Sequence, residues 1–175
     1  LRMNPNDLPL GIDGCSAPVY GIPMQNMAEA VSRMADPRDL DQKRGAACRK
    51  ITSAMMAHPV MVAGPGKFDT DLITTAKGKV FSKGGAEGYQ IIGVMPGVIE
   101  EDSPGLGIAI KIADGDPLGR ARAYISLLIL GALGVLNEKD LESLKFQEKS
   151  MVKNWRGIEV GEIRPAFDLD LFGGK

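Results

Sequence analysis

Histidine and cysteine are scarce in this 175-residue chain, which has one histidine and two cysteines. Cys15 and Cys48 lie far apart and form no C-x-x-C pair, so the sequence disfavours both a disulfide framework and a self-contained tetrahedral zinc site. No signal peptide is visible. We therefore predict a cytoplasmic protein with two free thiols.

The chain also lacks a long apolar run and an excess of charge of either sign. Its most apolar segment, residues 123–136, is too short to cross a bilayer. The 21 basic and 22 acidic residues leave a net charge of −1, which creates no field to attract nucleic acid or an anionic membrane. We expect neither of these partners.

Three apparent motifs are better explained without a functional role. The run from Gly64 to Lys67 imitates the end of a phosphate-binding loop, but no Ser or Thr follows the lysine. Ser150–Lys153 matches S-x-x-K, yet one chance match is expected here, and we interpret the segment as a charged linker. His58 precedes a proline at a predicted helix end, which favours a capping role over catalysis.

The periodicity of apolar residues predicts a mixed α/β (α+β) domain covering residues 1–175. A chain of this length can bury roughly 70% of its extended surface. Glycine turns separate short β-rich runs, and helical spacing precedes and follows them, so we expect an antiparallel sheet flanked by helices. The expected helices are 24–35, one ending before His58-Pro59, 70–76, 117–136 capped by Asp116, and a short one after Asn137; the expected strands are 80–82, 90–95, 106–112 and 158–163.

Lys83, Gly84 and Gly85 form the first candidate site. A lysine at a strand end beside two glycines can reach a substrate carboxylate, and the glycines let the substrate approach the backbone. A glycine-rich hairpin with a solvated lysine explains the same residues equally well.

The second candidate is the loop Asp13-Gly14-Cys15-Ser16, where a carboxylate, a thiol and a hydroxyl crowd together. An ordinary Asx-turn with a small buried cysteine is the alternative. Because the loop is rich in small residues, it can approach the sheet edge at Lys83 without clashes. We predict that Asp13, Cys15 and Lys83 line one concave site.

Several segments together resemble the asparaginase II family of thermolabile amidohydrolases. They are GIDGCSAPVY, AHPVMVAGPGKFDTDLI, KVFSKGGAEG, GLGIAIKIADG and NWRGIEVGEIRPAF, which occur in this order over most of the chain. The resemblance implies the fold of serine β-lactamases and penicillin-binding proteins, in which a helical region adjoins an antiparallel sheet flanked by helices.

The resemblance also implies a chemistry, the hydrolysis of L-asparagine to L-aspartate and ammonia through a serine acyl-enzyme. Lys83 matches the second lysine of that fold, the one in K-[ST]-G, and would shuttle protons or hold the substrate's charge. Asp13 and Ser16, with Gly84 and Gly85, would contact substrate. In some relatives the cysteine matched by Cys15 binds zinc with a cysteine and a lysine from the N-terminal half, so zinc is expected only in the full-length protein and no cofactor is required.

The departure from the family pattern is that the nucleophilic S-x-x-K segment and the other metal ligands have no counterpart in this sequence. The resemblance thus implies the C-terminal half of such an enzyme, inactive by itself, which forms a homodimer or pairs with an N-terminal half. Three alternatives stay open: a glutaminase or β-lactam hydrolase of the same fold, a non-catalytic binding module, and a subunit whose N-terminal partner is encoded separately.

Overall fold

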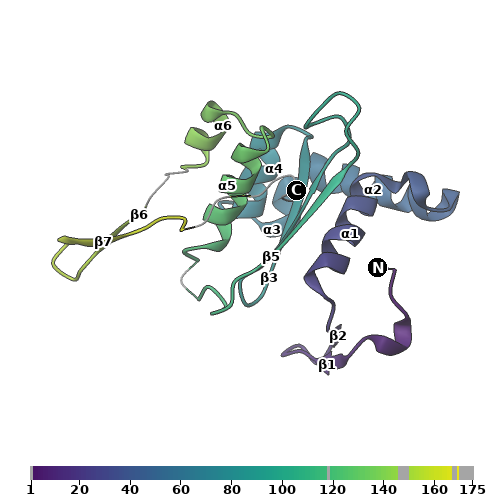
Figure 1. Cartoon of the computed structure of the whole chain (residues 1–175), viewed down its shortest axis with the longest axis horizontal. Helices are drawn as coiled ribbons and strands as arrows, with labels where there is room; N and C mark the ends of the chain where they lie inside the picture. Colours follow the sequence, from purple (N-terminus) through teal and green to yellow (C-terminus); the bar gives the residue numbers. More distant parts are fainter. Residues whose placement is uncertain (1, 118, 146–149, 167–168, 170–175) are drawn as a thin grey trace.

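The centre of the molecule is a three-stranded antiparallel sheet with helices on both faces (Figure 1). A computed structural model describes residues 2–117, 119–145, 150–166 and 169. The strands are β3 (Val80–Gly85), β4 (Tyr89–Val94) and β5 (Leu106–Lys111), in this order across the sheet. The mixed α+β class and the predicted hairpins are confirmed, whereas the relation to the β-lactamase fold stays a prediction.

Six helices and two short 3-10 turns complete the described core. They are η1 (Pro5–Asp7), α1 (Met24–Ala35), η2 (Pro37–Asp39), α2 (Gln42–Ala57), α3 (Pro59–Ala63), α4 (Phe68–Ala76), α5 (Arg122–Ala132) and α6 (Glu138–Ser143). Helix α2 ends before His58-Pro59 as predicted, and the proline begins α3 because its fixed φ suits a first helical position. No helix in the described part of the chain combines the length and apolar character needed to cross a membrane.

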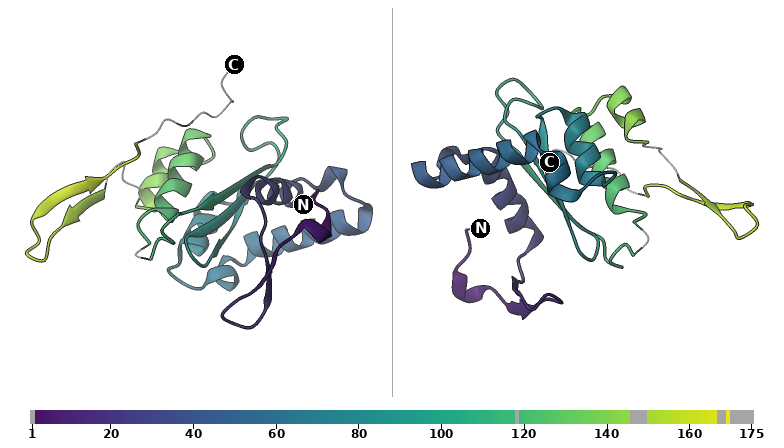
Figure 2. Two further views of the ribbon diagram at one scale, coloured as in Figure 1. Left: turned by 60° about the horizontal axis from the view of Figure 1, so that its bottom comes forward. Right: turned by 180° about the vertical axis from the view of Figure 1, so that it is seen from behind.

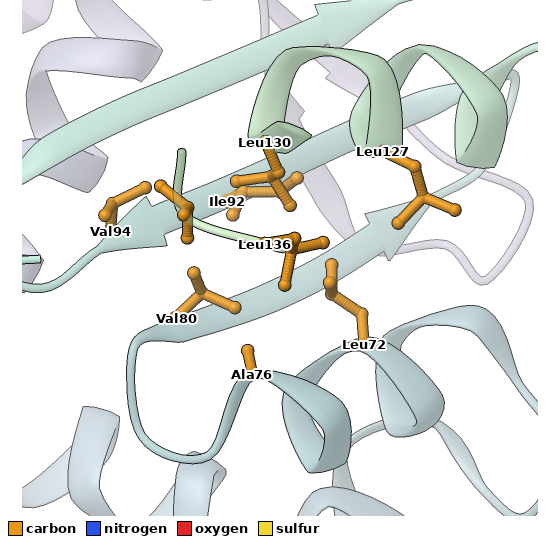
Figure 3. Packing of buried hydrophobic residues seen from close by; sticks show 9 residues of the cluster. Leu72, Ala76, Val80, Ile92, Val94, Leu127, Leu130 and Leu136 are labelled. Carbon is orange, nitrogen blue, oxygen red and sulfur yellow. The ribbon is translucent and has the colours of Figure 1, made fainter. Parts of the chain in front are cut away.

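Helices α4 and α5 cover one face of the sheet and enclose the larger hydrophobic cluster (Figure 3). Leu72 of α4 and Leu130 of α5 are fully buried there against Val80 and Ile92 of the strands. Burial of each such side chain contributes about 1.5–3 kcal/mol. This cluster fixes α4 and α5 relative to β3 and β4.

Helix α1 packs on the opposite face so closely that its backbone touches the sheet at Gly107. A Cβ on Gly107 would overlap the carbonyl oxygen of Ala28, and the ring of Phe81 fills the corresponding space above Gly93. Gly93 and Gly107 are cross-strand partners. Because these two neighbouring glycines have no side chains, the backbone of α1 and the ring of Phe81 can pack directly on the sheet.

Two hairpins extend away from this body at different ends (Figures 1 and 2). The first consists of β1 (Leu10–Ile12) and β2 (Pro18–Tyr20), and the second of β6 (Ser150–Lys153) and β7 (Glu159–Ile163). Both expose large apolar side chains, including Ile12 and Trp155. The last strand was predicted, but the segment interpreted as a charged linker before it is strand β6.

The helix predicted over residues 117–136 is shorter, because α5 begins at Arg122 and ends at Ala132. The N-cap is Ala121 and not Asp116 as predicted, but the Asp116 carboxylate accepts hydrogen bonds from the backbone N–H groups of Arg120, Ala121 and Arg122 at 2.7–3.1 Å. Gly134, with a φ of +70°, turns the chain after α5. The spacing of apolar residues did not reveal where α5 begins or where it ends.

Gly107→Ala is expected to destabilise the protein by about 3 kcal/mol or more, since the added methyl meets helix backbone that cannot move alone. Urea unfolding measures the change. Gly161→Ala is the matched control, because Gly161 is exposed in a strand and has no neighbouring atom near its Cβ direction. That variant should stay within about 0.5 kcal/mol of the parent; equal effects of the two substitutions would contradict the close packing of α1.

The stability of the fold should fall in acid partly through Asp116. Burial raises the pKa of this carboxyl, but the three backbone N–H donors outweigh burial and hold the pKa below its ordinary value of 3.8. The stabilisation is therefore complete above that value and is lost as pH falls below it through the folded-state pKa. Unfolding free energies measured between pH 6 and about pH 2 should decline less steeply for Asp116→Asn, and an unchanged slope would refute this role.

Candidate functional site

Lys83 lies near the end of β3, where the strand's two faces have different environments. Val80 belongs to the cluster under α4 and α5, whereas Phe81 belongs to the cluster beside α1 and α2. Because side chains alternate along a strand, Lys83 shares the face of Phe81, and Ser82 shares that of Val80. The lysine is exposed, and its Nζ donates to the carbonyl oxygen of Gly84 at 2.6 Å.

A cavity of about 390 Å³ opens beside Lys83. Its other walls come from the end of α2 and from α3, and they are mostly apolar: Ala54, Met55, His58, Met61 and Val62. The single histidine therefore lies in the same cavity as the candidate lysine, which its sequence position alone did not reveal. Lys83 and His58 are the two side chains of this lining that can carry or transfer a proton.

Gly84 and Gly85 both have structural reasons to be glycine. A Cβ on Gly84 would overlap the guanidinium of Arg122 and lie 3.2 Å from Oδ2 of Asp69. A Cβ on Gly85 would lie 2.9 Å from the ring of Tyr89, its cross-strand partner. The approach of a substrate to these two glycines stays a prediction.

A buried carboxylate, Asp69, lies against the other side of this strand end. Only 5% of the residue is exposed. Its Oδ1 accepts hydrogen bonds from Ser82 Oγ at 2.6 Å and Gln90 Nε2 at 2.7 Å, and its Oδ2 accepts one from the backbone N–H of Gly84 at 2.7 Å. Hydrogen bonds to a charged acceptor are about twice as strong as neutral ones, so this network ties α4 firmly to β3 and β4.

Arg122 and Tyr89 complete the polar surroundings. Arg122, the first residue of α5, donates from Nη1 to the carbonyl oxygens of Gly85 and Tyr89 at 3.3 and 3.4 Å. The hydroxyl of Tyr89 is buried and has no hydrogen-bond partner among the described residues. Burial raises the pKa of Tyr89 above its ordinary value, so this phenol stays neutral at physiological pH.

The loop with Asp13, Cys15 and Ser16 turns between β1 and β2 and is fully exposed. It is an Asx-turn, in which Asp13 Oδ1 accepts the backbone N–H groups of Cys15 at 2.8 Å and Ala17 at 2.9 Å. No hydrogen bond or ion pair among the described residues joins this loop to Lys83. Their shared site stays a prediction.

Zinc binding by Cys15 with ligands from an N-terminal half stays a prediction. In the part of the chain that the structure describes, no three His, Cys, Asp or Glu side chains gather in a way that could hold a metal ion. Oδ1 of Asp13 already accepts the two backbone hydrogen bonds of the turn. Both cysteines are free thiols, Cys15 exposed and Cys48 half-buried.

The S-x-x-K match at Ser150–Lys153 lies on strand β6 and not on a helix. The motif works when serine and lysine share one helical face, which is the geometry of positions i and i+3. Lys153 is exposed and forms an ion pair with Glu159 at 3.8 Å. The interpretation of this match as incidental agrees with its strand conformation.

A model of the L-asparaginase II family matches residues 1–165. The chain belongs to this family. A comparison with curated proteins found no match. Membership suggests an asparaginase-type function and agrees with the segments that carry the sequence resemblance, among them the one containing Lys83 and the one containing Asp13 and Cys15.

Sequence reasoning missed Asp69, Gln90 and Arg122. One signal was present for Asp69: Leu72, Ile73 and Ala76 follow it at i+3, i+4 and i+7, which places the aspartate on the buried face of its helix. An acidic residue on such a face needs partners, so it marks a polar network. Arg122 was missed because the helix was predicted to start at residue 117, whereas Arg122 is the first residue of α5.

The predicted shared site can be tested by a spin label on Cys15 in a Cys48→Ala background. If Lys83 and the loop line one site, the label should broaden the amide resonances of Gly84 and Gly85. If these two resonances are broadened no more than the reference, the loop and Lys83 are more than about 15 Å apart. That distance is well beyond the roughly 4–6 Å at which charges shift each other's pKa, and it would rule out the shared site. The amide of Gly134, beyond α5, serves as the unbroadened reference.

Proposed function

We propose that this chain provides the Lys83 side of the active site of an asparaginase-type amidohydrolase. The observation that carries the proposal is the position of Lys83: it lines a cavity of about 390 Å³ and stands at a strand end held by a buried network. Family membership supplies the reaction class, the hydrolysis of L-asparagine by water to L-aspartate and ammonia.

In the proposed mechanism a serine oxygen attacks the side-chain amide carbon of asparagine. The C–N bond breaks, the nitrogen takes a proton and leaves as ammonia, and the aspartyl group remains as an ester on the serine. Water then hydrolyses the ester and restores the hydroxyl. Lys83 either transfers the proton or holds the substrate's α-carboxylate as a fixed positive charge, two roles open to a lysine amine.

The nucleophile in this proposal comes from outside the described residues. S-x-x-K occurs once in the sequence, at Ser150–Lys153, and that segment is a strand. Pairing with an N-terminal segment that carries a helical S-x-x-K, in a longer chain or on a separately encoded subunit, would complete the site. The same segment would have to bring the zinc ligands that Cys15 lacks here.

Lys83→Ala in the full-length enzyme is expected to lower ammonia release from asparagine by about 10²–10⁴-fold, the usual loss when a proton-transfer group is removed. Lys153→Ala is the matched control, since Lys153 is an exposed lysine in the β6–β7 hairpin, and it should keep the parent rate. Equal effects of the two substitutions would mean that Lys83 is the wrong lysine. Glutamine as a second substrate would separate an asparaginase from a glutaminase.

The same assay on residues 1–175 alone should detect no ammonia above background. Turnover near the rate of the full-length enzyme would show that the nucleophile lies within these residues and would overturn the proposed pairing.

A further inference from the structure

The buried carboxylate of Asp69 has a role beyond linking α4 to the sheet. Its three hydrogen-bond donors include the side chain of Ser82 and the backbone N–H of Gly84, the residues immediately before and after Lys83. Asp69 therefore holds the chain on both sides of the candidate catalytic lysine without touching the lysine itself.

The geometry of the strand means that fixing Ser82 and Gly84 also fixes the direction in which the Lys83 side chain points. Because neighbouring side chains on a strand point to opposite faces, a clamp that keeps Ser82 against α4 turns Lys83 toward α2 and α3. The cavity lined by Met55, His58 and Lys83 lies on that side. Gly84 and Gly85 are paired with Gln90 and Tyr89 of β4, and because glycine restricts the backbone least, the bonds to Asp69 add a second restraint to this strand end.

The network also contains more polar groups than packing needs. Asp69 is 5% exposed, and Ser82 and Gln90 are fully buried. Burying a carboxylate is costly unless hydrogen bonds compensate, so a well-packed apolar trio would hold α4 on the sheet at lower cost. Position 69 is in the first turn of α4, where the helix dipole favours a negative charge and lowers that cost.

We propose that Asp69 is a positioning residue for Lys83: through Ser82 and Gly84 it fixes the strand end so that the lysine faces the cavity between α2 and α3. This inference rests on the proposed function of Lys83. The part of Asp69 that matters is the acceptor facing Gly84 together with a polar partner for Ser82, and not the negative charge as such.

The proposal distinguishes two substitutions. Asp69→Ala removes every acceptor at this position and leaves the Ser82 hydroxyl and the Gly84 N–H without their partner, while Gln90 Nε2 keeps its hydrogen bond to Ser82 Oγ. Asp69→Asn can keep the acceptor toward Gly84 while its amide N–H groups donate to Ser82 Oγ and to Gln90 Oε1, once the Gln90 amide turns over. That oxygen is buried and has no partner among the described residues, so it is available as an acceptor.

The first test uses the 175-residue chain and needs no activity. Amide hydrogen exchange at Gly84 should become at least tenfold faster in Asp69→Ala, while exchange at Gly93 in the neighbouring strand keeps its rate. Asp69→Asn should restore slow exchange at Gly84. Asp71→Ala, a change of an exposed aspartate on the same helix, is the matched control and should alter neither amide. Unchanged exchange at Gly84 in Asp69→Ala would overturn the positioning role, whatever the enzyme does.

The second test measures asparagine turnover in the full-length enzyme. Asp69→Ala should lower kcat about 10²-fold, the loss that a displacement of about 1 Å causes, with KM changed little, and Asp69→Asn should recover most of it. In a Lys83→Ala background, Asp69→Ala should have no further effect, because it acts through the lysine. The same loss in both backgrounds, or Asn as harmful as Ala, would overturn the proposal.

Two controls separate the possible failures. If Lys83→Ala leaves turnover unchanged, the proposed function fails, and with it the catalytic meaning of Asp69, while the exchange data still decide whether Asp69 holds the strand. If Asp69→Ala does not fold, Ser82→Ala replaces it, since this variant removes one clamp beside Lys83 and keeps the bond to Gly84. It should lower kcat in the parent and not in the Lys83→Ala background; a loss in both would overturn the proposal.

Discussion

The hydrogen bonds to the carboxylate of Asp69 are the constraint on which the arrangement around Lys83 depends. One side chain from α4 connects two strands, and its three partners all donate to it. Such a network is cooperative, because the loss of any partner leaves another polar group buried without a hydrogen bond. The strand end near the candidate site is therefore held by polar contacts, whereas the middle of the same strand is held by the hydrophobic cluster under α4 and α5.

The two faces of the sheet have different tasks. On one face, α4 and α5 contact the sheet through large aliphatic side chains (Figure 3). On the other face, α1 rests with its backbone on Gly107, and the site cavity opens between α2, α3 and Lys83. The face with the tight backbone contact is also the face with the cavity, whose walls come from α2, α3 and Lys83.

Much of this arrangement could be predicted from the sequence, and the exceptions have physical reasons. Alternation of Leu106, Ile108 and Ile110 and the proline-started repeat after Pro23 identified β5 and α1, because periodicity reports which face is buried. The start of α5 could not be found this way, because Asp116 holds residues 120–122 in a turn before the helix through side-chain hydrogen bonds, and such bonds do not appear in the spacing of apolar residues. Lys83 was recognised from its neighbouring glycines, but only tertiary structure places His58 in its cavity and brings Asp69 and Arg122 to Gly84 and Gly85.

The packing of α1 on β5 has a consequence for how the protein reaches its fold during synthesis. Asp36 at the end of α1 accepts the backbone N–H of Gly105, although 69 residues separate the two positions. At translation rates of about 5–20 residues per second, the helix therefore emerges roughly 3–14 seconds before its docking strand exists. Throughout that interval its apolar face, with Val31 and Ala35, lacks β5 and can pack only against α2, Phe81 and Ile91 as these emerge. Nascent chains of this protein should be captured by chaperones that bind apolar segments, and release should coincide with completion of the sheet.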